Sequence, residues 1–144
     1  MNVRLPKDED IKIANGQDIA RIMRKILLRQ NRLHRKKEYF WVIGLNTAND
    51  IEYIELIAIG SLNTVNINPI DVFSLAVSKK CDKIILCHNH PSGNMKPSEA
   101  DIKLTYSLMA GGKLLNVKIL DHIIICDTKD YYSLKDHDIP DELQ

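Results

Sequence analysis

Two hydrophobic spacings follow one another along this chain, and each predicts a different kind of element. From about Gln17 the apolar residues recur at helical spacing, which is typical of an amphipathic helix. Asn15 and Asp18 are suited to cap its start. We therefore expect a basic amphipathic helix over residues 17–37, preceded by a polar and loosely held lead-in over residues 1–16.

Short runs rich in β-branched and aromatic residues predict the strands. Residues 38–45 and 51–59 form two such runs, and the turn chemistry between them predicts a hairpin. Residues 83–87 are mostly apolar, as in a buried central strand. Three further strand-like segments are expected near the end of the chain, over 114–120, 122–126 and 131–134.

Two more helices are expected between these strands. Pro69 at a first helical position predicts a helix through the apolar residues that follow it, after a polar connection over 63–68. The next helix is expected over 98–110, where the pair Gly111-Gly112 would end it. This order of elements predicts one α/β layered domain around a mixed sheet.

Composition narrows the class of protein. The chain has 144 residues, 44% of them hydrophobic, which is enough for one sizeable core. No run reaches the roughly 18 apolar residues of a membrane span, and the N-terminus lacks the apolar region of a signal peptide. Three cysteines without framework spacing are typical of a reducing compartment, so we expect a cytoplasmic protein.

Charge is uneven along the chain although the formal net charge is only +1. Eight of the 20 Lys and Arg residues lie between positions 21 and 37, and residues 136–144 are expected to form an acidic tail. The basic cluster indicates either a contact surface for nucleic acid or an acidic partner, or an ordinary solvated helix face. No aromatic residue that could stack on bases is interleaved with it, which favours the solvated face.

The candidate chemistry lies in residues 87–101, which read Cys-His-Asn-His-Pro-Ser-Gly-Asn-Met-Lys-Pro-Ser-Glu-Ala-Asp. His88 and His90, two apart at the end of an extended strand, should point to the same side. Ser98 is suited to be an N-cap and Asp101 lies in the first helical turn, so the loop should return Asp101 toward the histidines. Two neutral imidazoles and one carboxylate are a ligand set for a catalytic zinc ion with its fourth position open.

A structural explanation of the same residues stays open. Ser-x-x-Asp is also a helix-capping pattern, and a single histidine at a strand end is usually only hydrogen-bonded. The two explanations are compatible, because one oxygen of Asp101 can bind a metal ion while Ser98 closes the helix end. The coincidence of both histidines with this loop and this cap favours metal binding.

Hydrolysis at such a site needs a group that takes a proton from the attacking water. Zinc lowers the pKa of a bound water to about 7, within reach of a nearby carboxylate. Glu99 is a poor candidate, because it lies two residues from Asp101 on a helix and should point elsewhere. Spacing alone does not choose among the remaining acidic candidates, Glu38, Glu52, Glu55 and Asp71.

The spacing His-x-His, seven residues, Ser, two residues, Asp resembles the JAMM (MPN+/JAB) metalloprotease motif throughout. Three sequence motifs are similar to those of the bacterial RadC-type branch of this family: His-Asn-His-Pro-Ser-Gly, the later Pro-Ser-x-x-Asp, and Leu120-Asp121-His122. The resemblance implies a JAB/MPN domain over residues 38–135. Its fold would be an α-β-α sandwich around a mixed β-sheet, similar to that of the cytidine deaminases, with the N-terminal helix leading into it.

The resemblance also implies an activity and a set of roles. The family contains zinc-dependent hydrolases that cleave a peptide or isopeptide amide, so a peptide or an isopeptide-linked protein is the expected substrate. By position in the motif, His88, His90 and Asp101 would bind Zn²⁺. Glu38, which opens a Glu-x-Phe strand as in the family, would be the general base. Ser98 would help to stabilise the oxyanion.

A second class of function is a DNA-associated accessory domain with a mainly structural zinc site. The RadC-type branch has long been labelled with DNA repair, and the basic helix is the feature that would contact DNA. Deamination is disfavoured because the chain has no Pro-Cys-x-x-Cys passage. His122 stays open between a site residue and a structural strand histidine. A second copy of the chain is also an expected partner, which would form a homodimer, and no membrane contact is expected.

Overall fold

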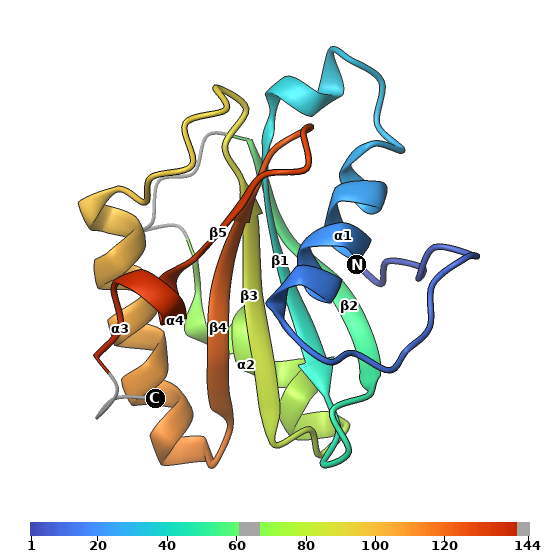
Figure 1. The fold of residues 1–144 in the computed structure, drawn as a ribbon. Coiled ribbons are helices and arrows are strands. Elements are labelled where there is room, and N and C mark those ends of the chain that lie inside the picture. The colour runs from blue at the N-terminus through green and yellow to red at the C-terminus, as the bar shows by residue number, and fades with distance from the viewer. Residues whose placement is uncertain (61–66, 141–144) are drawn as a thin grey trace.

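The computed structural model describes residues 1–60 and 67–140, which form a mixed sheet with helices on both faces (Figure 1). Most of the predicted connection over 63–68 and the end of the predicted acidic tail lie outside the described residues. The elements are α1 (Gly16–Leu27), η1 (His34–Lys36), β1 (Glu38–Leu45), β2 (Ile51–Gly60), α2 (Pro69–Ser78), β3 (Lys83–Asn89), α3 (Glu99–Leu115), β4 (Lys118–Ile125), β5 (Tyr131–Ser133) and α4 (Leu134–His137).

Strand β3 lies at the centre of the sheet, whose order is β2-β1-β3-β4-β5. β3 pairs antiparallel with β1 and parallel with β4, so the sheet is mixed as predicted. β1 and β2 form the predicted antiparallel hairpin. Its turn is closed by the Asn46 amide, which donates to the Asp50 carbonyl, and by Asn49 in the left-handed region at φ 64°. The α/β prediction is therefore confirmed.

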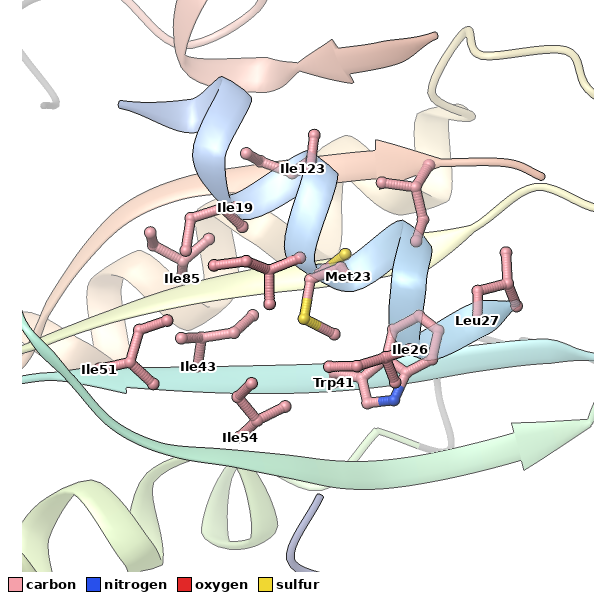
Figure 2. Close-up of a cluster of buried hydrophobic side chains, with 14 of the residues drawn as sticks. Ile19, Met23, Ile26, Leu27, Trp41, Ile43, Ile51, Ile54, Ile85 and Ile123 are labelled. Carbon is pink, nitrogen blue, oxygen red and sulfur yellow. The ribbon is translucent and has the colours of Figure 1, made fainter. Parts of the chain in front are cut away.

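Side chains alternate along the central strands, and this alternation builds one apolar layer on each face of the sheet. Trp41 and Ile43 of β1 point toward α1, and Figure 2 shows them around Met23 of that helix. Val42 of β1 and Leu86 of β3 point the other way, into the layer under α2 and α3. The arrangement is an α-β-α sandwich in which β3 is covered on both sides.

Helix α1 is held by its apolar side. Its buried residues are Ile19, Ala20, Ile22, Met23, Ile26 and Leu27. The helix ends at Leu27, whereas the prediction continued it to residue 37. Between positions 29 and 37 the only apolar residue is Leu33, which is exposed, so a longer helix would have no side to bury. Arg35 instead donates to the carbonyls of Leu28 and Gln30, and η1 follows.

The lead-in over residues 1–16 differs from the prediction of a loosely held segment. Its backbone bonds to β2, since the Val3 amide donates to Ile54 and the Ile51 amide donates to Ile11. Partly buried side chains from the lead-in pack against the α1 layer: Val3, Leu5 and Ile13. These apolar residues are isolated in a polar sequence, so no periodicity revealed that the segment is packed.

Part of the basic cluster is paired with acidic residues of the lead-in. Arg21 Nε lies 2.9 Å from Glu9 Oε2, and Lys25 Nζ lies 2.7 Å from the same oxygen and 2.7 Å from Asp8 Oδ2. The hydrogen bonds from Arg21, against the opposing effect of burial, lower the pKa of Glu9 to about 2. These charges therefore tie the lead-in to α1.

Helix α3 continues through Gly111 and Gly112, where the prediction ended it. A side chain at Gly112 would place its Cβ 2.3 Å from the carbonyl oxygen of Val117, so glycine is needed here for close approach. The helix ends instead at Asn116, whose φ of 57° is a left-handed C-cap. This contact brings the chain straight from α3 into β4.

The predicted strands over 114–120 and 122–126 are one strand, β4, and residues 114 and 115 belong to α3. Asp121 separated the two predicted strands, and His122 follows it in β4. Asp121 and His122 are both buried, and each is hydrogen-bonded to a residue outside β4: Asp121 to Ser133 and His122 to His88. Asp121 accepts from the Ser133 hydroxyl and from the Lys135 amide, which fastens the start of α4.

The first residues of the predicted acidic tail are packed against the domain. Ile139 is buried with Leu134, and the Tyr106 hydroxyl donates to the Asp138 carbonyl. Across the described parts of the chain, no helix combines the length and the apolarity that crossing a bilayer requires.

Candidate metal centre

Three donor side chains from successive segments meet at one end of the sheet. His88 lies in β3, His90 follows the strand directly, and Asp101 lies in the first turn of α3. His88 Nε2 is 2.9 Å from His90 Nε2, and Asp101 Oδ2 is 3.5 Å and 3.4 Å from these two nitrogens. His88 and Asp101 are buried and His90 is partly exposed. The structure thus brings together the three residues that the sequence selected, and they could bind a metal ion.

Backbone pairing explains why both imidazoles reach this place. His88 is on the same face of β3 as Leu86, under α3, and its ring stacks on Phe40 with centroids 6.2 Å apart. The His90 amide donates to Ile125 at the end of β4, so the chain stays aligned with the sheet beyond β3. Gly93, at φ 81°, then turns the loop and its amide donates to the His90 carbonyl.

Asp101 both caps α3 and faces the histidines. Its amide donates to Ser98 Oγ at 3.0 Å, and its Oδ2 accepts from the Ser98 amide at 2.9 Å, which completes a capping box. The same Oδ2 is the atom nearest the two imidazoles. The capping role of Asp101 is therefore observed, and the same carboxylate oxygen is also placed where a metal ligand would have to be.

The hydrogen bonds of His90 show that the site suits a cation. His90 Nδ1 lies 2.7 Å from the carbonyl oxygen of Asn94, which can only accept, so Nδ1 carries the proton. In its neutral form, His90 then presents the Nε2 lone pair toward His88 and the Asp101 carboxylate. Lone pairs that converge in this way repel one another unless a cation lies between them, so the donor set fits a divalent metal ion.

The pKa shifts of Asp101 and His90 also indicate that the electrostatic potential at the centre is negative. Burial acts to raise the pKa of Asp101, but the hydrogen-bonded imidazoles of His88 and His90 hold it well below its usual range. Burial acts to lower the pKa of His90, but Asp101, the Asn94 carbonyl and the more distant Glu38 together raise it. A positive charge at this point is therefore stabilised by its surroundings.

Glu38 opens β1 beside the centre. Phe40 pairs with His88 across β1 and β3, and Glu38 lies on the same face two residues earlier. Glu38 and His90 line one open cleft of about 780 Å³, which also includes Lys36 and Lys96. The other acidic candidates, Glu52, Glu55 and Asp71, are not among the residues that line this cleft.

Asn89 was not singled out from the sequence, yet it holds the backbone around Glu38. Its side chain is buried, its Oδ1 accepts from the Tyr39 amide at 2.6 Å, and its Nδ2 donates to the Lys37 carbonyl at 2.9 Å. These bonds attach the residues on both sides of Glu38 to the end of β3. The sequence signal for it was its position between the two histidines.

His122, which the sequence left open, lies beside the centre. It is fully buried, with Nε2 2.7 Å from His88 Nδ1 and Nδ1 2.6 Å from Thr105 Oγ1. Burial, and secondarily the neighbouring His88, lower the pKa of His122 well below its usual value. Sequence reasoning missed Thr105, whose one signal is its place a helical turn after Asp101.

Ser98 lies at the N-cap of α3, where its Oγ accepts from the Asp101 amide. Its hydroxyl proton can be donated to another acceptor, because a hydroxyl both accepts and donates. The role of Ser98 in stabilising an oxyanion therefore stays a prediction.

Comparison with known proteins gives the family of this chain. The family model described as RadC-like JAB domain matches residues 13–139. The chain belongs to the RadC-like JAB domain family. The mixed sheet and its covering helices are those of a JAB/MPN fold, so the fold implied by the resemblance is confirmed.

Relatives of this RadC-like JAB domain extend beyond it. A UPF0758 protein of Alkaliphilus metalliredigens is 48% identical over 110 residues, which is 76% of this chain and 47% of the relative. UPF0758 proteins of Caldanaerobacter subterraneus and Methanosarcina mazei are 40% identical over 119 residues and 43% identical over 125 residues. These matches cover 83% and 87% of this chain, and 49% and 52% of the respective relatives. The chain thus spans about half the length of the curated relatives it matches.

Proposed function

We propose that this RadC-like JAB domain is a zinc-dependent hydrolase that cleaves a peptide or isopeptide amide. The observation that carries the proposal is the convergence of His88, His90 and Asp101, of which His90 lines an open cleft together with Glu38. A zinc ion held by these three residues supplies Lewis acidity and makes water a stronger acid at neutral pH. Three protein ligands leave a coordination position open for this chemistry.

The residues around the centre divide the proton and charge handling of amide hydrolysis. Glu38 accepts a proton from the attacking water and passes it to the leaving amine, because a carboxylate within the cleft can act first as base and then as acid. Ser98 donates its hydroxyl proton to the oxyanion that develops on the former carbonyl oxygen. Asn89 keeps the Glu38 backbone in place while this happens.

Glu38→Gln tests the assignment of the base. The variant should bind zinc as the wild-type protein does, while the rate of zinc-dependent amide hydrolysis falls by roughly 10²–10⁴-fold. Short peptide amides and ubiquitin-like isopeptide conjugates, each with and without chelator, are the substrates to assay. Glu52→Gln is the matched control, because Glu52 is an exposed β2 residue whose carboxylate accepts from Asn46. Wild-type turnover in Glu38→Gln would exclude Glu38 as the base.

DNA binding is the second candidate function, because three lysines line the same cleft: Lys36, Lys37 and Lys96. This surface would attract phosphates, whereas Arg21 and Lys25 of the basic cluster are already ion-paired within the domain. The measurement is the affinity for single- and double-stranded DNA at several salt concentrations. Affinity that falls steeply with salt in wild type, and is lost with Lys36→Gln and Lys96→Gln together, would favour this role.

A further inference from the structure

A buried chain of hydrogen bonds leads from Asp101 to the far side of the His88 ring. Thr105 Oγ1 lies 2.7 Å from the carbonyl oxygen of Asp101 and 2.6 Å from His122 Nδ1. His122 Nε2 lies 2.7 Å from His88 Nδ1. Thr105 is 1% exposed and His122 is 0% exposed, so solvent does not compete for these bonds.

The chemistry of each group decides where the protons lie. The Asp101 carbonyl has no proton, so the Thr105 hydroxyl donates to it. A hydroxyl has one proton, so Thr105 can only accept from His122, whose Nδ1 must carry the proton. Neither ring partner of His122 is a carboxylate, and an imidazolium enclosed here would be costly, so Nε2 carries only a lone pair.

His88 therefore donates its Nδ1 proton to His122, and its lone pair is on Nε2, the atom that faces His90 and Asp101. We propose that Thr105 and His122 are positioning residues that hold His88 in the tautomer required of a metal ligand. The inference depends on the proposed function only in requiring that the centre binds a metal ion, and not that it hydrolyses an amide.

The two histidine ligands differ in how their tautomers are set. His90 donates to a backbone carbonyl, an acceptor that cannot change its role. His88 donates to an imidazole, and a neutral imidazole exists in two tautomers. If His122 moved its proton to Nε2, it would donate to His88 Nδ1, and the His88 proton would move to the nitrogen that faces the centre. Thr105 prevents this, because it offers His122 an acceptor on the Nδ1 side only.

Packing keeps the rings of His88 and His122 in the orientation that this chain of hydrogen bonds needs. Phe40 stacks on the His88 ring with an angle of 11° between the planes, and meets the His122 ring edge-on at a centroid distance of 5.7 Å. A flipped His88 ring would point carbon atoms at His122 Nε2. The proton positions, rather than ring rotations, are therefore the variable that Thr105 controls.

Thr105→Val and Thr105→Ser form the matched pair of variants. Valine has the shape of threonine without the hydroxyl, so His122 loses its acceptor and its tautomer is no longer fixed. We expect Thr105→Val to weaken zinc binding by roughly 10–100-fold, the usual effect of removing a group that orients a metal ligand. Thr105→Ser restores the hydroxyl and should bind zinc like the wild type. Affinity is measured by competition between the protein and a chelator, with circular dichroism melts to confirm folding.

The tautomers can also be read directly in the wild-type protein. Nitrogen-15 NMR of the imidazoles, in metal-free protein at mildly alkaline pH, should show the proton of His122 on Nδ1 and that of His88 on Nδ1. A proton on His122 Nε2, or unchanged zinc affinity in folded Thr105→Val, overturns the inference. The NMR result needs neither bound zinc nor a substrate, so it is independent of the proposed hydrolysis and decides the question even if Thr105→Val fails to fold.

Discussion

Successive residues at the end of β3 have different surroundings, because Cys87 on one face lies in an apolar layer and His88 on the other lies at the candidate metal centre. Ile85 and Cys87 point into the α1 layer, where burial raises the pKa of the Cys87 thiol and leaves it a small apolar side chain. Leu86 points into the other layer, and His88 follows it at the candidate metal centre. Both faces stabilise the fold by burying apolar area, but only the α3 face also holds, at the His88 end of β3, the buried polar groups of the centre in a hydrogen-bonded network. Stability and chemistry can therefore be perturbed separately.

Asp101→Asn should produce the largest effect, on the polar face. The amide keeps an oxygen for the Ser98 backbone, so the helix cap persists, but the anionic ligand is lost. The variant should retain much less than one zinc ion per chain, as measured by metal analysis after gel filtration. Ser98→Ala is the control in the opposite sense: it should lower the free energy of unfolding by about 1 kcal/mol and retain zinc. Full zinc occupancy in Asp101→Asn would contradict the ligand assignment.

Ile43→Ala perturbs the apolar face alone. Ile43 is fully buried among the side chains of the α1 layer, so the variant creates a cavity there (Figure 2). The free energy of unfolding should fall by about 2–5 kcal/mol, as measured by urea denaturation. The folded fraction should bind zinc with wild-type affinity. A large loss of zinc affinity in folded protein would show that the two faces are coupled.

Asn89→Ala tests the place where the two faces meet. Asn89 ends β3 on the side of Cys87, yet its bonds to Lys37 and Tyr39 fix the backbone around Glu38. Removing the amide leaves buried backbone groups without partners and should cost about 1–3 kcal/mol of stability. Hydrolysis should also slow while zinc affinity stays unchanged, which steady-state kinetics and chelator competition measure together. Unchanged kcat would mean that Asn89 serves the fold alone.

Glu9→Gln should have the smallest effect, and only above acidic pH. The pKa of Glu9 is lowered from 4.5 to about 2, so its ion pairs stabilise the folded state fully above pH 4.5. This stability is lost as pH falls toward 2, because the carboxylate then binds a proton in the folded state as well. The difference in unfolding free energy between wild type and Glu9→Gln should therefore shrink between about pH 5 and pH 2. A constant difference would contradict the ion-pair explanation.

The candidate centre could largely be predicted because its three donor residues are close in sequence. Strand alternation placed His88 and His90 together, and a helix cap returned Asp101 to them. Thr105 could not be found in this way and the place of His122 stayed open, because the contacts of His122 with Thr105 and His88 depend on how α3 and β4 pack beside β3. Local patterns do not reveal that packing.

The fold was predicted as a class, and its errors share a cause. Gly112 was interpreted as a helix stop, although it is there to let Val117 approach the helix. Asp121 was interpreted as a break between two strands, although partners later in the chain satisfy its carboxylate. In each case a tertiary contact outweighed the local preference of the residue.

The tight passage from α3 to β4 has a consequence for anyone who engineers this domain. The Val117 amide donates to the Gly112 carbonyl, and β4 begins at the next residue, so the passage has no slack. A single inserted residue would turn His122 to the opposite face and bring a neighbour of the wrong kind to His88. Tags, reporters or circular breakpoints belong instead at the exposed hairpin turn around Ala48, at the far end of the sheet.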